Sequence, residues 1–251
     1  MNNQDVIHKN SYNIYLSVVA AAYNEAENLA QLIKEISEAL SKLSRQFEII
    51  IVNDGSIDNS PKVLHELMEH YPQLRVISFQ RRSGQTAAWE AGLKSCQGNY
   101  IATLDADLQN DPADIPKMLE HIVSGKCDFV NGWRKNRNDP WIRLISTRIG
   151  NAFRNWITNE SIHDSACGLK VFNRKCIESV KLFNGMHRFL PTLVRMEGFR
   201  IEELPVNHRP RIAGKAKYGV HNRLWRGLKD CFAVRWMQKR RLNYNMQEWQ
   251  R

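Results

Sequence analysis

The sequence lacks several features that would place it in familiar classes of protein. No apolar run approaches the roughly 18 residues that a membrane-spanning helix needs, and the longest candidate, Val18–Tyr23, has the length of a strand. The N-terminus shows no basic segment followed by an apolar stretch, so we expect no secretory signal. No Walker A sequence occurs, and the G-x-G-x-x-G fingerprint is missing after the first expected strand. These absences disfavour a membrane span, a P-loop nucleotide hydrolase and a dinucleotide-dependent enzyme.

Cysteine is scarce and scattered. The chain has five cysteines and no C-x-x-C pair, which argues against a zinc site and against a disulfide framework. This usage predicts a reducing, cytoplasmic environment. The five are Cys96, Cys127, Cys167, Cys176 and Cys231.

Charge is present in excess, and it is unevenly spread. The 251 residues are 43% apolar and 25% charged, which excludes global disorder and allows a large core. Residues 1–132 carry 11 basic and 17 acidic groups, whereas residues 133–251 carry 25 and 9, within a total net charge of +10. The basic second half predicts an anionic partner. Nucleic acid, an anionic membrane surface and a phosphorylated substrate all qualify on composition alone.

The first 130 residues alternate between the two periods of regular secondary structure. We expect strands at Ile14–Ala21, Phe47–Val52, Leu74–Phe79, Tyr100–Leu104 and Cys127–Val130. We expect helices over Leu29–Leu43, from Ser60 as N-cap with Pro61 at the first helical position, over Thr86–Ser95 and over Ile115–Val123. This alternation predicts an α/β fold, a mostly parallel sheet with helices on both faces.

The second half is less regular. We expect a helix over Trp141–Ile157, a strand at Leu169–Phe172, short helices over Arg174–Leu182 and His187–Met196, a strand at Ile201–Val206, a loop over Arg209–Val220 and a basic amphipathic helix over Asn222–Arg241. No internal repeat or Pro/Ser-rich linker is visible. We therefore expect one main domain, residues 1–220, with a basic helical extension, residues 221–251.

Polar clusters follow three of the expected strands. They are Tyr23-Asn24-Glu25, the stretch from Asn53 to Asp58, and Asp105-Ala106-Asp107-Leu108-Gln109. Because open α/β sheets bind ligands at the carboxyl ends of their strands, we expect these clusters to converge. Asp105, Asp107 and Gln109 offer oxygen ligands that suit Mg²⁺ or Mn²⁺ completed by phosphates. The alternative is a solvated loop whose Asp residues cap the next helix, and for Asp58 a cap or turn role is the favoured interpretation.

These clusters, together with Gly84-Gln85-Thr86-Ala87-Ala88, resemble the family 2 glycosyltransferases of the GT-A fold. Three later motifs narrow the resemblance to the polyprenyl-phosphate branch, typified by dolichol-phosphate mannose synthase. These motifs are Gly132-Trp133-Arg134, Asp164-Ser165-Ala166-Cys167-Gly168-Leu169-Lys170-Val171-Phe172 and His208-Arg209-Pro210-Arg211-x-x-Gly214-x-x-Lys217-Tyr218. The resemblance runs from about residue 16 to residue 240 and is specific through the number, order and spacing of its motifs.

The resemblance implies an inverting, metal-dependent transfer of a sugar from a GDP- or UDP-sugar to a polyprenyl phosphate. It implies a nucleotide-sugar site, a site for Mg²⁺ or Mn²⁺, and an acceptor-phosphate site. The nucleotide-sugar residues are Tyr23, Glu25, Asp54, Asp105, Ala106, Arg211 and Lys217, the last two closing over the diphosphate; the metal ligands are Asp105, Asp107 and Gln109; the catalytic residues are Asp107, Arg134 and Arg148, with both arginines on the acceptor phosphate.

Elementary chemistry supports this division of roles. A departing nucleoside diphosphate needs a metal and cations to absorb its charge. An attacking phosphate oxygen is already an anion, so no general base need be assumed, and arginine suits it through its bidentate fork. The chain departs from the family pattern at Ala22, where proline is common, at Arg82-Ser83, where asparagine is common, and at Asn53, the first position of a usual Asp pair.

The lipid acceptor that the resemblance implies lies in a membrane, so we expect the protein to dock there. Residues 200–251 carry 13 basic and 4 acidic groups, which predicts peripheral attachment at the cytoplasmic face through Asn222–Arg241. A separate membrane subunit would fit the same sequence. A nucleic-acid partner is disfavoured because three acidic clusters would repel it. A glycan acceptor and an inactive binding paralogue remain as alternatives.

Overall fold

The structure is a computed structural model that describes residues 14–135, 141–210 and 220–242, with the side chains of α5 and α8 described from residues 149 and 227 onward. The strands are β1 (Leu16–Ala22), β2 (Phe47–Asn53), β3 (Leu74–Ser78), β4 (Tyr100–Asp105), β5 (Phe129–Trp133), β6 (Lys170–Asn173) and β7 (Ile201–Pro205). The helices are α1 (Ala26–Ser41), α2 (Ser60–His70), α3 (Gln85–Ser95), α4 (Ile115–Val123), α5 (Trp141–Thr158), α6 (Lys175–Glu178), α7 (Leu190–Met196) and α8 (Val220–Arg240), with 3-10 turns η1 (Pro112–Asp114) and η2 (Met186–Phe189).

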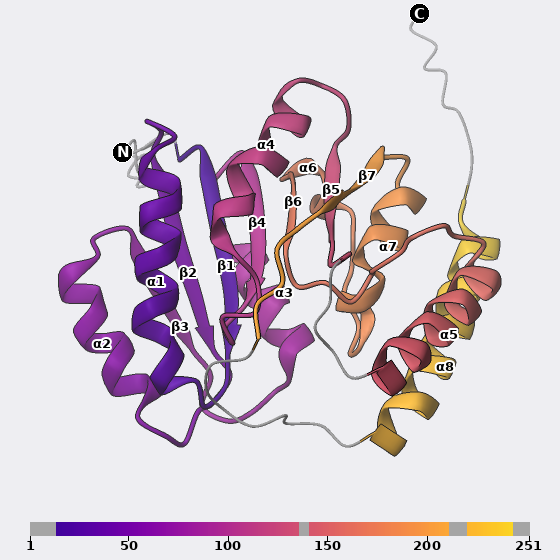
Figure 1. Cartoon of the computed structure of the whole chain (residues 1–251), viewed down its shortest axis with the longest axis horizontal. Coiled ribbons are helices and arrows are strands. Elements are labelled where there is room, and N and C mark those ends of the chain that lie inside the picture. The colour runs from indigo at the N-terminus through magenta and orange to yellow at the C-terminus, as the bar shows by residue number, and fades with distance from the viewer. Residues whose placement is uncertain (1–13, 136–140, 211–219, 243–251) are drawn as a thin grey trace, which may run out of the picture.

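The strands form one seven-stranded sheet in the order β3-β2-β1-β4-β6-β5-β7 (Figure 1). Six strands share one direction, and β6 runs antiparallel between β4 and β5. The predicted mostly parallel α/β fold is therefore confirmed. The inserted β6 returns the chain from β5 to the centre of the sheet, beside β4.

Two apolar layers cover the sheet, and the period of two along each strand explains them. Val18 and Ala20 of β1 face the layer made by α1 and α4, whereas Val19 faces the layer made by α3 and α7. The central strands are buried on both faces, which is why they read as continuous apolar runs. This buried core therefore fixes the carboxyl ends of the parallel strands side by side along one edge of the sheet.

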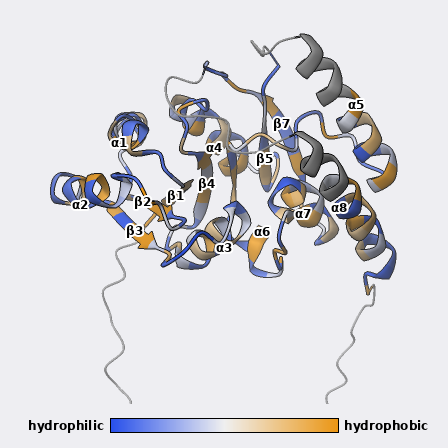
Figure 2. Ribbon diagram, turned by 90° about the horizontal axis from the view of Figure 1, so that it is seen from below, coloured by the Kyte–Doolittle hydropathy of each residue, from blue (hydrophilic) through white to orange (hydrophobic). Residues whose placement is uncertain are grey.

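Helices α5 and α8 pack against each other at one side of the molecule (Figures 1 and 2). A third apolar cluster, with Ile157, Phe189 and Val234 among its members, joins them to η2 and α7. The division into residues 1–220 and 221–251 stays a prediction. In the parts of the chain that the structure describes, no helix combines the length and the hydropathy needed to cross a bilayer.

Most expected elements are present close to their expected bounds. Two local expectations were wrong. The helix expected over Arg174–Leu182 ends at Glu178. Helix α2 begins at Ser60, and its N-cap is Asn59; Asp58 accepts a hydrogen bond from the Ser60 amide, 3.0 Å away. Asp58 thus has the turn role that the sequence favoured. The Ser60 hydroxyl instead accepts a hydrogen bond from the Glu25 amide at 3.1 Å.

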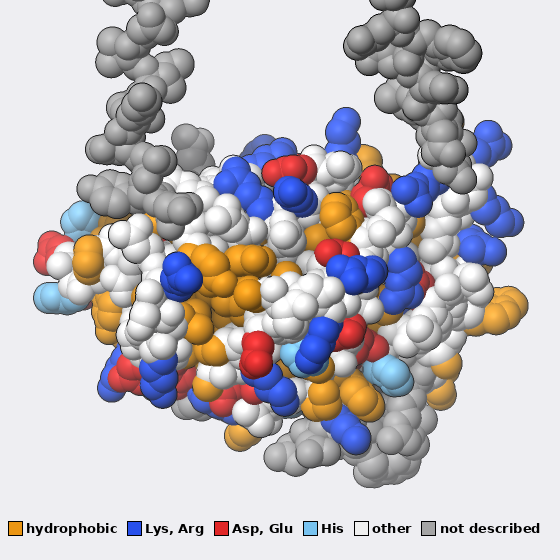
Figure 3. All heavy atoms as spheres, turned by 90° about the horizontal axis from the view of Figure 1, so that it is seen from above, with side chains coloured by type: hydrophobic (Ala, Val, Ile, Leu, Met, Phe, Trp, Pro, Cys, Tyr) orange, Lys and Arg blue, Asp and Glu red, His pale blue; other side chains and the backbone are white. Residues whose placement is uncertain are grey.

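The edge at the amino ends of the parallel strands carries its own apolar surface (Figure 3). A hollow there is lined by Tyr15, Leu43, Pro116 and Val123 among others. Tyr15 directly precedes β1, so this hollow lies at the end of the sheet opposite the polar clusters. We place the candidate site at the other edge.

Candidate active site

The three polar clusters meet at the carboxyl edge of the sheet, as the sequence predicted. Strand β1 lies between β2 and β4, and its last residues pair with theirs: Ala22 with Asn53 and Ala21 with Asp105. The turns that follow are joined by hydrogen bonds. Asn24 donates its amide to Ser56 Oγ at 2.9 Å and accepts from the Ile57 amide at 2.9 Å. The predicted nucleotide residues thus share one rigid edge.

Glu25 is buried at the start of α1. Its carboxylate accepts a hydrogen bond from Asn28 Nδ2 at 2.6 Å, and its amide donates to Ser60 Oγ at 3.1 Å. Tyr23 lies beside Arg82, whose guanidinium carbon is 4.3 Å from the centroid of the tyrosine ring. A nucleobase that stacks on Tyr23 would therefore meet the arginine that stands where the family commonly has asparagine.

Asp54 binds the start of α3. Its Oδ1 accepts from the Ser83 amide at 2.6 Å, and its Oδ2 accepts from the Gly84 amide at 2.9 Å. The approach is close because position 55 is glycine: a β-carbon there would lie 2.5 Å from the Arg82 amide nitrogen, and its φ is +65°. Asp54 consequently shapes the carboxyl edge of the sheet by fixing the turn before α3.

Asp105 is the last residue of β4, and Asp107 and Gln109 lie in the turn that follows it; these three residues are here called the acidic cluster. Gln85 Nε2 donates to Asp105 Oδ1 at 2.8 Å, and Asp107 Oδ1 accepts from the Gln109 amide at 3.3 Å. Burial and the neighbouring Asp107 carboxylate raise the pKa of Asp105 to about 6, against the positive charges of Arg134 and Lys170. Two carboxylates that repel each other in a partly buried turn form the electrostatic environment that a divalent cation relieves.

The donor set fits a magnesium or manganese ion. Two carboxylates and one amide oxygen are hard ligands, and such ions keep positions open for phosphates and water. Among the described side chains, no group of three or more His, Cys, Asp and Glu could hold a metal ion. A site here would therefore depend on Gln109 and on ligand oxygens to complete it.

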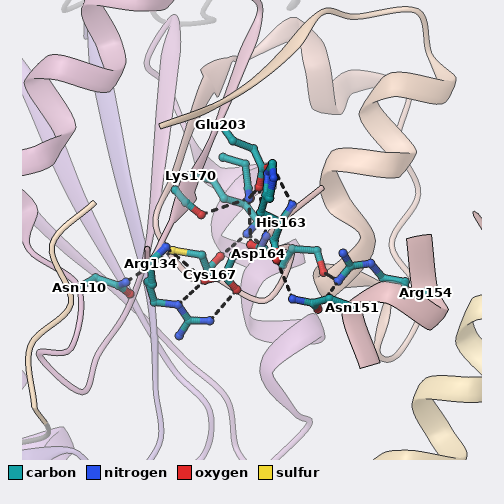
Figure 4. A network of polar contacts seen from close by, with 12 residues as sticks. Asn110, Arg134, Asn151, Arg154, His163, Asp164, Cys167, Lys170 and Glu203 are labelled. Carbon is teal, nitrogen blue, oxygen red and sulfur yellow. Dashed lines mark hydrogen bonds and ion pairs between the residues drawn. The ribbon is translucent and has the colours of Figure 1, made fainter. Parts of the chain in front are cut away.

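Arg134 is held by Asp164 (Figure 4). Its Nε donates to Oδ2 at 2.7 Å and its Nη2 donates to Oδ1 at 2.9 Å, with the two side chains 11% and 6% exposed. Burial opposes the charge, but the hydrogen bonds to Asp164 hold the pKa of Arg134 above its ordinary value. Arg134 is therefore charged and oriented within the fold, because two of its donors are already bound.

The segment before β6 supports both the arginine and the acidic cluster. Besides binding Arg134 through Asp164, it places Gly168 against Asp105, where a β-carbon would lie 2.5 Å from Cγ. Lys170 is fully buried on β6 and donates to the carbonyls of Ser165 and Cys167. Burial lowers the pKa of Lys170. This segment fixes the spacing between the cation of Arg134 and the carboxylate of Asp105.

Arg154 of α5 anchors the same segment from the other side. Its guanidinium is buried and donates to Ser165 Oγ, to Asn151 Oδ1 at 2.9 Å and to the Ile162 carbonyl at 2.8 Å. Burial lowers the pKa of Arg154. Asp164, Gly168, Lys170 and Arg154 received no role from the sequence. The sequence did contain a signal for three of them, because Asp164, Gly168 and Lys170 lie in the motif from Asp164 to Phe172.

Three predicted residues lie where the structure gives no side-chain account. Arg148 lies in α5 before residue 149, where description of the side chains begins, and Arg211 and Lys217 lie outside the described residues. Ala106 is buried at the turn after β4. The structure thus brings Tyr23, Glu25, Asp54 and the acidic cluster to one edge. The segment before β6 that contacts Asp105 through Gly168 also holds Arg134 through Asp164.

Comparisons with known sequences find relatives along most of the chain. The model of glycosyl transferase family 2 matches residues 17–180. Dodecaprenyl-phosphate galacturonate synthase of Rhizobium johnstonii is 37% identical over 223 residues, which are 87% of this chain and 66% of that protein. Undecaprenyl-phosphate 4-deoxy-4-formamido-L-arabinose transferase of Edwardsiella ictaluri is 35% identical over 208 residues, 82% of this chain and 63% of that protein. The chain spans just under two thirds of the length of these curated relatives.

Solved structures share the fold. Mannosyltransferase PcManGT from Pyrobaculum calidifontis, solved with GDP-Man and Mn²⁺, is 18% identical with a TM-score of 0.62, covering 93% of this chain and 66% of its own. Glucosyl-3-phosphoglycerate synthase from Mycobacterium tuberculosis, solved with Mn²⁺, UDP and phosphoglyceric acid, is 17% identical with a TM-score of 0.68, covering 92% and 80%. The resemblance seen in the motifs is confirmed: the chain belongs to glycosyl transferase family 2.

Proposed function

We propose that this protein transfers a sugar from a nucleotide-sugar donor to a polyprenyl phosphate, with inversion at the anomeric carbon. The observation that carries the proposal is the acidic cluster at the carboxyl edge of the sheet, next to the segment before β6 that contacts Asp105 through Gly168 and holds the buried cation of Arg134 through Asp164. The relatives named for dodecaprenyl- and undecaprenyl-phosphate sugars support the lipid acceptor. Inversion comes from the resemblance to the family.

The residues of the edge divide the work. Tyr23, Glu25 and Asp54 would hold the nucleoside, while Asp105, Asp107 and Gln109 would hold Mg²⁺ or Mn²⁺. Such an ion would supply positive charge to balance the charge that develops on the departing diphosphate. Ala106 lies in the turn between the two aspartates, and Arg211 and Lys217 are assigned to the diphosphate by the resemblance alone.

The reaction needs one bond exchange. An oxygen of the acceptor phosphate bonds to the anomeric carbon as that carbon's bond to the diphosphate oxygen breaks, and the electron pair leaves with the nucleoside diphosphate. The attacking oxygen carries negative charge at neutral pH, so the chain must position it and balance its charge. We assign this to Arg134 and Arg148. Asp164 keeps the Arg134 guanidinium in place while leaving donors outside the ion pair.

The donor is tested by thermal shift with GDP, UDP and their sugars, with and without Mn²⁺. We expect one nucleotide to stabilise the protein in a metal-dependent way, and Asp107→Ala to remove that effect while keeping the fold. A folded protein that no nucleotide shifts would favour an inactive paralogue or a donor site completed by a membrane subunit.

The acceptor is tested with polyprenyl phosphate against a soluble glycan. Arg134→Ala would leave Asp164 buried without its partner, so the cleaner variant is Arg134→Gln combined with Asp164→Asn. We expect the KM for lipid phosphate to rise while donor binding stays within twofold of wild type. Turnover of the glycan with none of the lipid would establish the alternative acceptor class.

We also propose that the protein works as a peripheral protein at the cytoplasmic face of the membrane. Both helices of the α5–α8 pair expose large apolar side chains: Trp156 is 78% exposed, and Phe232 and Trp236 are each 62% exposed. Lys229, Arg235, Lys239 and Arg240 stand on the same α8 helix. Aromatic residues beside basic ones suit an anionic lipid interface. A membrane subunit docking on the same helices is the alternative.

A further inference from the structure

The chain after β7 pairs with the chain that follows the acidic cluster. His208 and Asn110 form an isolated antiparallel bridge, and the Arg209 amide donates to the Gln109 carbonyl at 3.0 Å. Asn110 in turn accepts a hydrogen bond from the Asp105 amide at 3.4 Å. The end of the turn that carries the acidic cluster is therefore bound to residues from a distant part of the sequence.

The side chain of Arg209 completes this link. Its Nη1 lies 2.7 Å from Glu35 Oε2 on α1, and its Nη2 lies 2.7 Å from Asp111 Oδ1, the residue before η1. Glu35 is itself oriented, because its other oxygen accepts from Gln31 Nε2 at 2.8 Å. A planar guanidinium binds two carboxylates in fixed directions, whereas the donors of an ammonium group rotate about its stem and fix no plane. Arg209 thus joins α1, the start of η1 and the backbone of Gln109.

The turn needs such support. Leu108, between Asp107 and Gln109, is buried and has a φ of +60°. A leucine in the left-handed region is strained, and such strain persists only where the surroundings hold both ends of the turn. Strand β4 holds the Asp105 end. The contacts of Arg209 hold the Gln109 end.

We propose that Arg209 is a positioning residue for the acidic cluster, a bridging guanidinium that keeps the strained turn in its metal-binding conformation. The inference rests on the proposed function, because it concerns the metal site of that function. It assigns no contact between Arg209 and substrate. It also gives the second half of the chain a role in building a site whose ligands all lie in the first half.

The direction in which the Mn²⁺ affinity changes distinguishes a positioning role of Arg209 from a purely electrostatic one. Arg209 is a cation near a proposed cation site, so removing its charge alone would strengthen Mn²⁺ binding. If Arg209 positions the turn, removing it weakens Mn²⁺ binding. We would titrate Mn²⁺ by electron paramagnetic resonance at a temperature well below unfolding, with and without the nucleotide that stabilises the wild type.

We expect Arg209→Gln to raise the Mn²⁺ Kd at least tenfold and the donor KM in parallel, with kcat at saturating metal and donor within threefold of wild type. Arg209→Lys restores the charge without the fork and should recover little. Glu35→Gln, a change on α1 that keeps the shape of the side chain, should weaken Mn²⁺ binding several-fold. Combining it with Arg209→Gln should add nothing further, since both remove one link. The matched control is Arg200→Gln, which removes the same charge from an exposed ion pair with Asp128.

Each result decides the matter. Unchanged or tighter Mn²⁺ binding in Arg209→Gln, with normal binding by the wild type, overturns the positioning role and leaves the proposed function intact. A wild type that binds neither Mn²⁺ nor nucleotide overturns the inference and shows that this chain alone does not form the donor site. If Arg209→Gln does not fold, Glu35→Gln carries the test alone, and a wild-type Kd in that variant overturns the inference.

Discussion

Gly168 lies against Asp105 so closely that a β-carbon at position 168 would overlap the Asp105 carboxylate, 2.5 Å from its Cγ. Asp105 is the last residue of β4, whereas Gly168 lies in the connection that leads into β6. Their contact exists because β6 runs antiparallel beside β4 and pairs Thr103 with Lys170. The Thr103 hydroxyl reinforces this contact, because it donates a hydrogen bond to the Gly168 carbonyl at 2.8 Å. The position of the Asp105 carboxylate, a proposed metal ligand, therefore depends on glycine at position 168.

Gly168→Ala should push the Asp105 carboxylate out of place. We expect Mn²⁺ binding to weaken at least tenfold and the protein to lose roughly 1–3 kcal/mol of stability, the usual cost of overpacking. Isothermal titration with Mn²⁺ and urea unfolding would measure the two effects. Gly150→Ala is the control, because open space surrounds that helical glycine and alanine favours a helix. Wild-type metal binding in Gly168→Ala would show that the carboxylate adapts freely.

Asp105→Asn should change how stability depends on pH. The pKa of Asp105 is raised to about 6 in the folded protein, above its value of roughly 3.9 in an unfolded chain. The folded state therefore gains stability from the bound proton below pH 4, and this gain is lost as the pH rises through about 6.

The asparagine variant lacks this titration. With chelator present, its stability relative to wild type should increase by roughly 1–3 kcal/mol between pH 4 and pH 7.5, measured by urea unfolding. Added Mn²⁺ should then stabilise the wild type and leave the variant unchanged. Parallel stability curves across this pH range would contradict the raised pKa.

Asp164→Asn should destabilise the protein much more than Asp128→Asn. Both aspartates bind an arginine through two oxygens, but Asp164 and Arg134 are nearly buried, while the pair of Asp128 and Arg200 is exposed. Breaking a buried pair leaves an uncompensated charge and costs about 3 kcal/mol or more. An exposed pair contributes little.

Thermal unfolding measures this difference. We expect the midpoint of Asp164→Asn to fall by roughly 6–12 °C for a domain of this size, and that of Asp128→Asn to change little. Arg134→Gln added to Asp164→Asn should recover part of the loss, because no buried charge then lacks its partner. Equal effects of the two single substitutions would contradict the burial of the pair.

Phe232→Ser with Trp236→Ser should reduce binding to anionic vesicles. The two aromatic side chains are exposed and four residues apart, so they share one face of α8. Co-sedimentation with vesicles containing anionic lipid should show at least a tenfold loss of affinity, with the fold and nucleotide binding retained. Val123→Ser is the control, since Val123 is exposed at the end of α4. Full co-sedimentation of the double variant would remove α8 from membrane docking.

The sequence by itself determined the alternation of strands and helices and the edge of the sheet where the polar clusters meet. Apolar runs such as Phe47–Asn53 bury on both faces, and the period of the helices between them requires parallel crossovers. Both signals are local along the chain, because they arise from the geometry of one strand or one helix. The polar residues after β1, β2 and β4 therefore had to meet at one edge, and their motifs pointed to the family.

Only the tertiary structure decided which polar groups bind one another. The sequence assigned Arg134 to a phosphate and Asp54 to a nucleotide, but the fold also gives them partners of their own, in Asp164 and in the amides of Ser83 and Gly84. The sequence left Arg209 without a role, yet in the structure its side chain bridges Glu35 and Asp111. Such pairs join residues far apart in sequence. Their choice depends on strand order, above all on the antiparallel insertion of β6, which no local periodicity records.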